Sequence, residues 1–337
     1  MEQPGIGNVA PNAALVQMAM SYSRSRMVCA AARLGVADAL GDEARSVDEV
    51  ADRCRADADA HYRLLRALAS IGLTEETAPR QFRLTPVGRP LRRDVPESVW
   101  AAVAFWADLL ADDWSLLTEC VRAGKPAGEA RPAGVPSRWS QEPEGYAIFR
   151  AVMGTASAED YAPIAKTCDF SRAKVVADPG GGRGALILAV VELCPKVRGM
   201  LVDLEASIEA AKPRFAGNSR CELVAADLTE SVPSGADVCL LKQVLHGCKD
   251  AAAVGILKNC RAVMPENGAL LIIEFLLPVR VAGADPQLEL RLMSDLNMLA
   301  VTGGRERSEP EWNKLLETAG FRLAGVFPAG SEMGIVG

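Results

Sequence analysis

The sequence predicts an α/β fold in which a doubly wound parallel sheet follows a helical N-terminal domain. From Lys174 onward, apolar runs of strand length alternate with helical segments, the order expected of a parallel sheet with helices on both faces. Before residue 98, three helical segments precede a short hairpin, which is typical of a winged helix. The chain has 337 residues, which is long for one compact core, so we expect two domains.

The N-terminal elements are predicted from helical periodicity and from signals at the helix ends. Residues 13–40 have a helical pattern, and Gly35 with the polar GDEARS run ends its apolar stretch. Ser46 and Glu49 have the spacing of a capping box at the start of the next helix. Residues 57–73 place four aliphatic side chains on one helical face, and the FRLT run after them predicts the hairpin. Because this region is weakly charged, we expect it to serve dimerisation rather than DNA binding.

The C-terminal half is predicted as a series of strands and helices of ordinary length. We expect strands over residues 175–178, 199–204, 221–228, 237–242 and 269–278. We expect helices over residues 185–194, 205–215, 251–264 and 309–321. This alternation predicts a Rossmann-like sheet, whose ligands bind at the carboxyl ends of the strands.

Composition and charge exclude several classes of function. The net charge is −6, which does not favour nucleic-acid binding, and the sequence has no apolar run long enough for a transmembrane helix. Residues 1–12 lack the layout of a signal peptide, so we expect a cytoplasmic protein. The nearest cysteines are Cys239 and Cys248, no carboxylate cluster stands out, and no metal is expected. One of the two histidines, His61, is expected at the surface or as a helix cap.

A glycine-rich turn follows the first strand of the predicted sheet. It reads DPGGGRGA and contains Asp178, Gly180, Gly182 and Gly184. Glycines at a strand-to-helix turn let a ligand approach the backbone, and the free N–H groups of the following helix can bind it. Gly180, Gly182 and Ala185 also satisfy the relaxed fingerprint of nicotinamide sites. The turn alone therefore leaves the identity of the cofactor open.

Acidic residues end the next two strands. Asp203 ends GMLVD, 23 residues after Gly180, where a carboxylate can bind ribose hydroxyls. Asp227 lies 24 residues further on, where it could meet an adenine amino group. A solvated carboxylate at a strand end is the alternative for Asp227. Together with the glycines, these acids predict a nucleoside-binding edge.

With these three strand ends, residues 150–337 resemble the class I S-adenosylmethionine-dependent methyltransferases. More narrowly, the chain resembles the small-molecule O-methyltransferases typified by plant caffeic acid O-methyltransferase and the bacterial polyketide O-methyltransferases. The segments DLNMLAVTGG and TGGRERSEPEWNKLLETAGF are similar to the C-terminal part of that family. The resemblance implies a homodimer and three regions. These are a winged-helix dimerisation domain (1–98), a linker with acceptor-pocket helices (99–160) and an S-adenosylmethionine-binding methyltransferase domain (161–337).

The resemblance also implies which residues bind the cofactor. The glycines would hold its methionine part, Asp203 its ribose and Asp227 its adenine. The full implied set is Ser157, Asp178, Gly180, Gly182, Gly184, Asp203, Leu204, Asp227, Leu228 and Lys242.

The family's general base is a histidine at the end of the fourth strand, and His246 occupies that position. Glu274 matches the carboxylate that orients the base, and Glu306 matches a second supporting carboxylate. The alternatives are a paired strand-end acid for Glu274 and a solvated loop charge for Glu306. Gly247 and Cys248 replace the Asp and Trp that usually follow the histidine, so the acceptor is expected to differ from those of relatives.

These residues predict transfer of a methyl group to a hydroxyl of a small aromatic secondary metabolite. The implied acceptor-binding residues are Met153, Phe149, Asn297, Met298, Gly247 and Arg24. One alternative keeps the cofactor but transfers to sulfur, nitrogen or carbon, for example a small acidic thioether, without a base. Two others are a nicotinamide-dependent oxidoreductase and a DNA-binding regulator that uses the winged helix. We expect a small-molecule partner, with no nucleic acid and no membrane.

Overall fold

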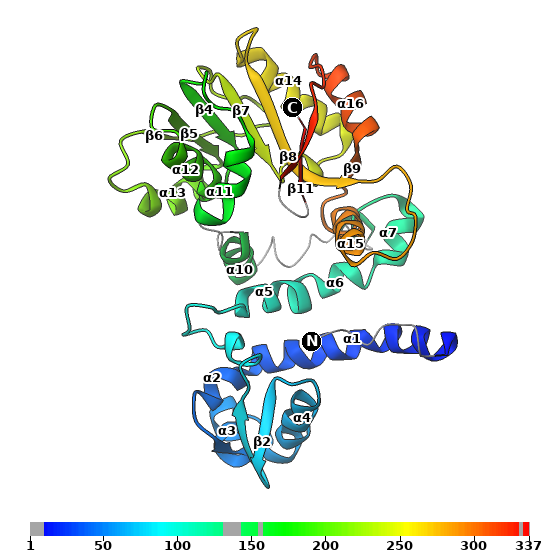
Figure 1. The fold of residues 1–337 in the computed structure, drawn as a ribbon. Coiled ribbons are helices and arrows are strands. Elements are labelled where there is room, and N and C mark those ends of the chain that lie inside the picture. Colours follow the sequence, from blue (N-terminus) through cyan, green and yellow to red (C-terminus); the bar gives the residue numbers. More distant parts are fainter. Residues whose placement is uncertain (1–9, 131–142, 154–157, 330–332, 337) are drawn as a thin grey trace. The chain divides into compact units, whose positions relative to one another are not determined.

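The computed structural model describes residues 10–130, 143–153, 158–329 and 333–336 (Figure 1). The chain forms two compact units. One comprises Met1–Asp112 with Ser137–Val152, and the other comprises Asp113–Pro136 with Met153–Gly337. One boundary falls within the helix α6 (Ala111–Trp114) and another within α10 (Pro143–Met153), so the predicted linker region 99–160 contributes to both units.

The N-terminal unit contains one long helix, several shorter ones and a small antiparallel sheet. Its helices are α1 (Pro11–Leu34), α2 (Val36–Leu40), α3 (Val47–Cys54), α4 (Ala58–Ser70), a 3-10 turn η2 (Arg89–Leu91), α5 (Trp100–Ala104), a π-helical turn η3 (Phe105–Leu109) and most of α10. Its strands are β1 (Arg45–Ser46), β2 (Thr74–Ala78) and β3 (Gln81–Leu84), in the order β1-β3-β2. The predicted hairpin is therefore the pair β2–β3.

Two of the predicted helix signals act as expected in this unit. Gly35 has a φ of +69°, which ends α1, so the predicted helix 13–40 is divided into α1 and α2. Ser46 and Glu49 form the capping box of α3 by reciprocal hydrogen bonds. His61 departs from the prediction: it is buried, and Asp57 caps α4 instead. Burial lowers the pKa of His61.

The second unit contains a mixed sheet with helices on both faces. Its strands are β4 (Val175–Pro179), β5 (Arg198–Asp203), β6 (Cys221–Ala225), β7 (Val238–Lys242), β8 (Ala269–Leu277), β9 (Arg307–Ser308), β10 (Val326–Ala329) and β11 (Met333–Val336). Its helices are α7 (Leu117–Ala123), α8 (Ala127–Ala130), α11 (Ala158–Thr167), α12 (Ala185–Leu193), α13 (Glu205–Ala211), η4 (Lys212–Phe215), η5 (Leu245–Gly247), α14 (Asp250–Val263), α15 (Pro286–Val301) and α16 (Glu309–Thr318). All predicted strands and helices of this half are present, which confirms the predicted fold class.

The strand order is β10-β11-β8-β7-β4-β5-β6, and β9 pairs with β8 (Figure 1). The five strands from β4 to β8 are parallel. Their carboxyl ends therefore meet at one edge, which brings the glycine turn and the acids of successive strands together. The antiparallel pair β10–β11 at the other side was not predicted, because these strands are short and carry little alternation.

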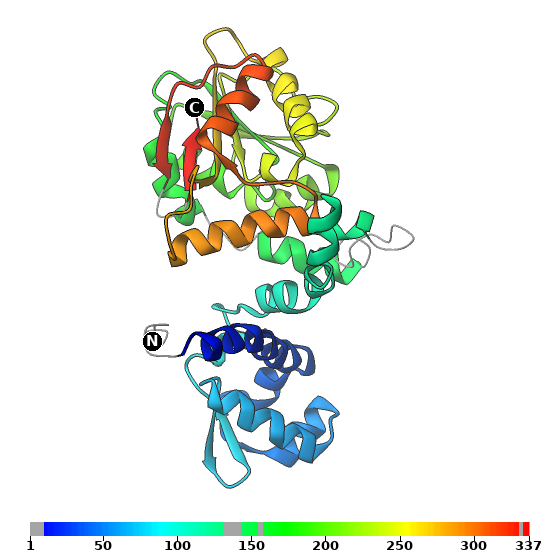
Figure 2. The same ribbon diagram turned by 90° about the vertical axis from the view of Figure 1, so that its right-hand side faces the viewer.

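Alternation along the strands explains how both faces of the sheet are covered. Val176, Leu201 and Leu240 pack on one face in a cluster with helices α11, α12 and α13. Their sequence neighbours pack on the opposite face with α14 and α16. Figure 2 shows α14 and α16 side by side on that second face. Because both faces are covered, the central strands β4, β5 and β7 are mostly apolar, as the sequence predicts for a parallel sheet.

Candidate functional site

His246 lies in a short helical turn directly after strand β7. Gln243 follows the strand with a φ of +51°, an uncommon conformation for a non-glycine residue, and the chain then turns into η5. The β7 side chains Leu240 and Leu241 are buried in the core, which anchors the strand. The His246 side chain is 15% exposed. A rigid strand thus carries the imidazole to the carboxyl edge of the sheet.

Glu274 holds the backbone around His246. It lies on β8, beside β7, and its Oε1 accepts hydrogen bonds from three successive N–H groups. These belong to Val244, Leu245 and His246, at 3.1, 3.0 and 3.2 Å respectively. Its Oε2 lies 3.7 Å from Nδ1 of His246. The alternative of a paired strand-end acid therefore describes part of what Glu274 does: it fixes the turn that presents the imidazole.

Glu306 makes the direct hydrogen bond to the imidazole. Its Oε1 lies 2.8 Å from Nδ1 of His246, and its side chain is fully buried. The alternative of a solvated loop charge is therefore wrong. A carboxylate can only accept here, so Nδ1 carries the hydrogen and Nε2 is left with a free lone pair. The arrangement is that of a general base held in one tautomer.

The segment that carries Glu306 is tied to the His246 turn by main-chain and side-chain contacts. The Arg305 N–H donates to the His246 carbonyl oxygen at 2.8 Å. Buried Arg307 donates to the carbonyl oxygens of Leu245 and Cys248, both at 3.0 Å. A Cβ atom on Gly304 would overlap the His246 carbonyl oxygen, so only glycine fits this close approach. Imidazole and carboxylate are thus held by one connected set of contacts.

The charges around His246 favour its protonated form. Burial alone would lower its pKa, but the carboxylates of Glu274 and Glu306 outweigh this and raise the pKa above 6.5. Burial raises the pKa of Glu274 to about 7, against the opposing effect of His246. Because the two groups lie 3.7 Å apart, the charge of each affects the protonation of the other.

The histidine and the two carboxylates that the family resemblance singled out lie together in the structure. Ligand atoms of His246, Glu274 and Glu306 lie within 4.8 Å of one another. They come from distant parts of the sequence, so no short spacing could reveal them. However, Nδ1 is bonded to Glu306 and Oε1 of Glu274 is engaged by three N–H groups. These bonds fit an imidazole–carboxylate pair better than a metal centre.

The glycine turn lies at the ends of β4 and β5 and is closed by Asp203. Gly180, Gly182 and Gly184 all have positive φ values, which glycine adopts without strain. The Gly182 N–H donates to Oδ2 of Asp203 at 2.8 Å, and the Leu204 N–H donates to Oδ1 at the same distance. Nothing lies within 4 Å of the position of a Cβ on Gly182, so the turn is open there.

Asp178 is a buried carboxylate directly before this turn. Neither of its oxygens has a hydrogen-bond partner among the residues that the structure describes. Burial raises the pKa of Asp178 to about 7, although the nearby Lys242 opposes the rise. Lys242 itself bonds to Oε1 of Gln243 at 2.5 Å and lies over the ring of Tyr161. An unpaired carboxylate and an open glycine turn suit a cationic, nucleoside-bearing ligand.

The residues predicted to bind the adenine side lie at the neighbouring strand ends. Leu204 is 53% exposed and follows Asp203, although it is a large apolar residue. Asp227 is exposed, and hydrogen bonds from the Thr229 side chain and N–H lower its pKa. Leu228 and Val244 lie close to the position of a Cβ on Gly180. Apolar surface and acids at one edge are what an adenosine group requires, so the residues present fit S-adenosylmethionine.

The structure places the predicted acceptor residues in different parts of the chain. Asn297 is buried on α15, and its Oδ1 accepts from the indole N–H of Trp114 at 3.0 Å. Met298 follows it and is half-buried. A Cβ on Gly247 would meet nothing within 4 Å, so there is open space beside His246. Met153 ends α10 with an exposed side chain.

The remaining predicted residues lie in the N-terminal unit or outside the described residues. Arg24 is exposed on α1. Phe149, on α10, packs against Phe105 and Tyr146. Ser157 lies outside the residues that the structure describes. The roles of all three stay predictions.

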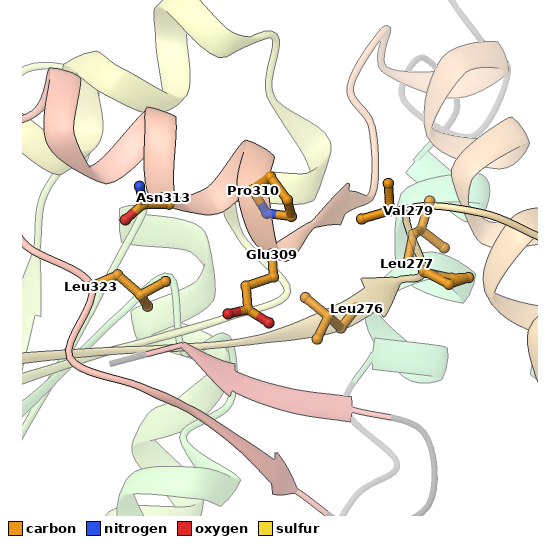
Figure 3. Close-up of a pocket in the computed structure, with 8 residues that line it drawn as sticks. Leu276, Leu277, Val279, Glu309, Pro310, Asn313 and Leu323 are labelled. Atoms are coloured by element: carbon orange, nitrogen blue, oxygen red, sulfur yellow. The ribbon is translucent and has the colours of Figure 1, made fainter.

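A separate groove lies at the carboxyl end of β8, beside the start of α16 (Figure 3). It has a volume of about 620 Å³ and is lined by Leu276, Leu277, Pro278, Val279, Glu309, Pro310, Asn313 and Leu323. Of the predicted site residues that the structure describes, none lines this groove. We therefore assign the site to the sheet edge, where the polar groups converge.

Sequence reasoning missed several residues that support the site. Ser294 donates to Oε1 of Glu306 at 2.8 Å, and Asp295 accepts the Glu306 N–H at 2.8 Å. Arg307 and Gly304 hold the His246 turn. The two glycines of TGGRERS could have indicated a close backbone approach. Arg307 lies in a charged run, a pattern that usually indicates surface residues. Ser294 and Asp295 carry no local signal at all.

The fold and the site define an α/β enzyme with a nucleoside-type cofactor edge and an imidazole–carboxylate pair at the fourth strand. Family profiles agree: an O-methyltransferase domain matches residues 114–322, and an O-methyltransferase dimerisation domain matches residues 16–94. The chain belongs to the O-methyltransferase family and is an S-adenosylmethionine-dependent methyltransferase. This confirms the resemblance and disfavours the oxidoreductase and DNA-binding alternatives.

Two characterised relatives show the range of the family. The chain is 37% identical to O-demethylpuromycin-O-methyltransferase of Streptomyces alboniger over 319 residues, which cover 93% of this chain and 84% of that protein. It is 32% identical to 8-amino-8-demethylriboflavin N,N-dimethyltransferase of Streptomyces davaonensis, with 91% of this chain and 89% of that protein covered. Relatives of similar sequence thus include methyltransferases named for oxygen and for nitrogen acceptors.

Solved structures agree with the fold along nearly the whole chain. The crystal structure of LaPhzM matches with a TM-score of 0.87 and 32% identity, covering 97% of this chain and 98% of that one. The methyltransferase CalO1 of calicheamicin biosynthesis, in its S-adenosylhomocysteine-bound form, matches with a TM-score of 0.72 and 34% identity, covering 96% of both chains. Among the described residues of the present chain, no helix has the length and hydrophobicity needed to cross a membrane.

Proposed function

We propose that this enzyme transfers the methyl group of S-adenosylmethionine to a hydroxyl of a small aromatic secondary metabolite, with His246 as general base. The hydrogen bond of 2.8 Å from Nδ1 of His246 to buried Glu306 carries the proposal. It fixes the tautomer in which Nε2 can accept a proton. Glu274 keeps the turn in place and adds a second negative charge near the imidazole.

S-adenosylmethionine supplies a methyl group already activated on a sulfonium. The enzyme then has to orient the acceptor and remove its proton, and orientation can account for roughly 7–11 kcal/mol of the barrier. A free imidazole, with a pKa of about 6.5, is too weak to ionise a phenol of pKa about 10 beforehand. His246 therefore takes the proton as the oxygen forms its new bond, and the two carboxylates stabilise the resulting imidazolium.

The proposed cofactor residues act by charge and shape. Asp178 offers its unpaired carboxylate to the cationic amino group, and the glycine turn gives the methionine part access to the backbone. Asp203 accepts from the ribose hydroxyls, Leu204 and Leu228 contact the adenine, and Asp227 meets its amino group. Lys242 and Ser157 complete the set.

We propose that the enzyme acts as a homodimer through its N-terminal domain. The helix α1 carries five large apolar side chains that are more than half exposed. Exposing so much apolar surface to water is unfavourable in free energy, so we expect another protein surface to cover it. They are Leu15, Val16, Met18, Met20 and Tyr22. Arg24 follows them on the same helix and is a candidate to receive an acidic acceptor.

A nitrogen acceptor is the second candidate, favoured by Gly247 and Cys248 after the base and by the N,N-dimethyltransferase among the relatives. Labelled S-adenosylmethionine and matched pairs of aromatic phenols and anilines distinguish the two. We expect label in the phenols, detected by mass spectrometry. Transfer only to the anilines would contradict the oxygen assignment, and S-adenosylhomocysteine binding, measured by calorimetry, would show that the cofactor site is intact.

The pH dependence of kcat/KM should have an acidic limb with its midpoint above 6.5. His246 must be neutral to accept a proton, so activity is present above its pKa and is lost as the pH falls through it. Because nearby carboxylates raise that pKa, Glu306→Gln should move the midpoint to lower pH and also lower the plateau. Glu266→Gln, at an exposed position after α14, is the matched control and should leave the profile unchanged. An upward shift in Glu306→Gln would contradict the assignment.

A further inference from the structure

Ser294 contacts the carboxylate that supports the base rather than the base itself. Its hydroxyl donates to Oε1 of Glu306 at 2.8 Å, and the same oxygen accepts from Nδ1 of His246 at 2.8 Å. A serine O–H and an imidazole N–H thus share one carboxylate oxygen. Ser294 lies on α15, in the middle of the helix.

Among the described residues, few other hydrogen bonds orient the Glu306 carboxylate. Its second oxygen, Oε2, is buried and has no hydrogen-bond partner among the residues that the structure describes. The side chain is fully buried, so bulk water does not screen its charge. The Glu306 N–H donates to Asp295, the next residue of α15. Two successive residues of one helix therefore hold both the backbone and the side chain of Glu306.

We propose that Ser294 is a positioning residue of the methyl-transfer reaction: its hydroxyl orients Glu306 and sets the pH at which His246 is available as the base. The inference rests on the proposed function, because it requires His246 to be the base. Ser294 does not need to touch acceptor or cofactor. It acts through the charge and the direction of one carboxylate oxygen.

The direction of the effect follows from charge. With a neutral imidazole, Glu306 carries its full negative charge, and the serine hydrogen bond is strongest. With an imidazolium beside it, part of that charge is neutralised and the serine bond contributes less. Loss of the hydroxyl therefore destabilises the deprotonated state more, and the acidic limb moves to higher pH. This is opposite to the shift expected for Glu306→Gln.

Other charged groups surround this pair and stay unchanged when Ser294 is replaced. They are Lys242 at the end of β7, Glu274 on β8, Asp295 on α15, and Arg305 and Arg307 on either side of Glu306. A shift of the midpoint on loss of the hydroxyl can therefore be assigned to the bond between Ser294 and Glu306.

The test measures kcat and KM against pH for Ser294→Ala and Ser294→Thr. We expect Ser294→Ala to lower the plateau kcat about tenfold, to leave KM within about twofold, and to raise the acidic midpoint by about half a pH unit, because a hydrogen bond to an ionised group is lost. Ser294→Thr keeps a hydroxyl and should stay near the wild type. Ser70→Ala, an exposed serine on α4, is the matched control.

A double-mutant cycle with Glu306→Gln tests whether Ser294 acts through the Glu306 carboxylate. If Ser294 acts through the carboxylate, Ser294→Ala should change kcat little in the Glu306→Gln background. An unchanged or lowered midpoint in Ser294→Ala would overturn the inference while leaving the base assignment intact. Full activity of His246→Ala would instead overturn the proposed function itself.

Discussion

Replacing His246 by alanine is expected to lower kcat by about 10²–10⁴-fold, the usual contribution of a general base. Of the two described groups that bond to Oε1 of Glu306, the imidazole can accept the acceptor's proton, whereas the hydroxyl of Ser294 is a poor base. A steady-state assay with the phenol identified by the acceptor screen measures the change.

The affinity for S-adenosylhomocysteine, measured by calorimetry on the same preparation, should stay within about twofold. It is the internal control, because the glycine turn, Asp203 and Asp227 bind without the imidazole. Wild-type turnover by this variant would rule out the base assignment. It would point instead to an acceptor that needs no base, such as a thioether or a neutral amine.

Replacing Gly304 by alanine is expected to have the second-largest effect. The added methyl would overlap the His246 carbonyl oxygen and approach the Gly247 carbonyl carbon to 2.6 Å. Backbone cannot move aside as a flexible side chain can, so the His246 turn must shift. A displacement of about 1 Å in a catalytic group can cost about 10²-fold in rate, and overpacking typically costs about 1–3 kcal/mol of stability. Both kcat and the thermal unfolding midpoint should fall.

Gly255→Ala provides the matched control for that variant. Gly255 lies in helix α14, and a Cβ there would meet nothing within 4 Å. In a helix interior, alanine is more stable than glycine by roughly 0.5–1 kcal/mol. The control should therefore unfold at a slightly higher temperature with unchanged kcat. Unaltered turnover in Gly304→Ala would show that the close approach to His246 is unimportant for catalysis.

The candidate site was predicted residue by residue, but its internal arrangement was not. His246, Glu274 and Glu306 were identified by their positions in a family pattern, and the structure brings them together. The sequence reasoning matched Glu274 to the carboxylate that orients the base, but it left open whether Glu274 or Glu306 bonds to Nδ1. In the structure, Glu306 makes the 2.8 Å bond to Nδ1, while Glu274 binds three backbone N–H groups. Which of two nearby carboxylates touches the imidazole depends on side-chain directions, which sequence spacing does not contain.

Local physics explains which elements were predictable. The strands β4, β5, β7 and β8 are largely buried and consist mostly of apolar residues, and capping residues or glycines mark the ends of several helices. The pair β10–β11 is short, lies at the edge of the sheet and has no such run, so it was missed. His61 was misplaced because its sequence position suggested a helix cap, whereas packing of α4 turned its side chain into the core.

Sequence patterns alone predicted the fold class and proposed the residues for nucleoside binding and proton removal. These follow from periodicity, glycine chemistry and a family pattern, all of which are local in the chain. The contacts that Ser294, Gly304 and Arg307 make with Glu306 and the His246 turn are visible only in the tertiary structure. These residues reach the site through contacts between β7, α15 and the segment before β9, which lie side by side only once the sheet has folded. Such long-range contacts depend on packing geometry, which cannot be predicted from the local pattern of a single sequence.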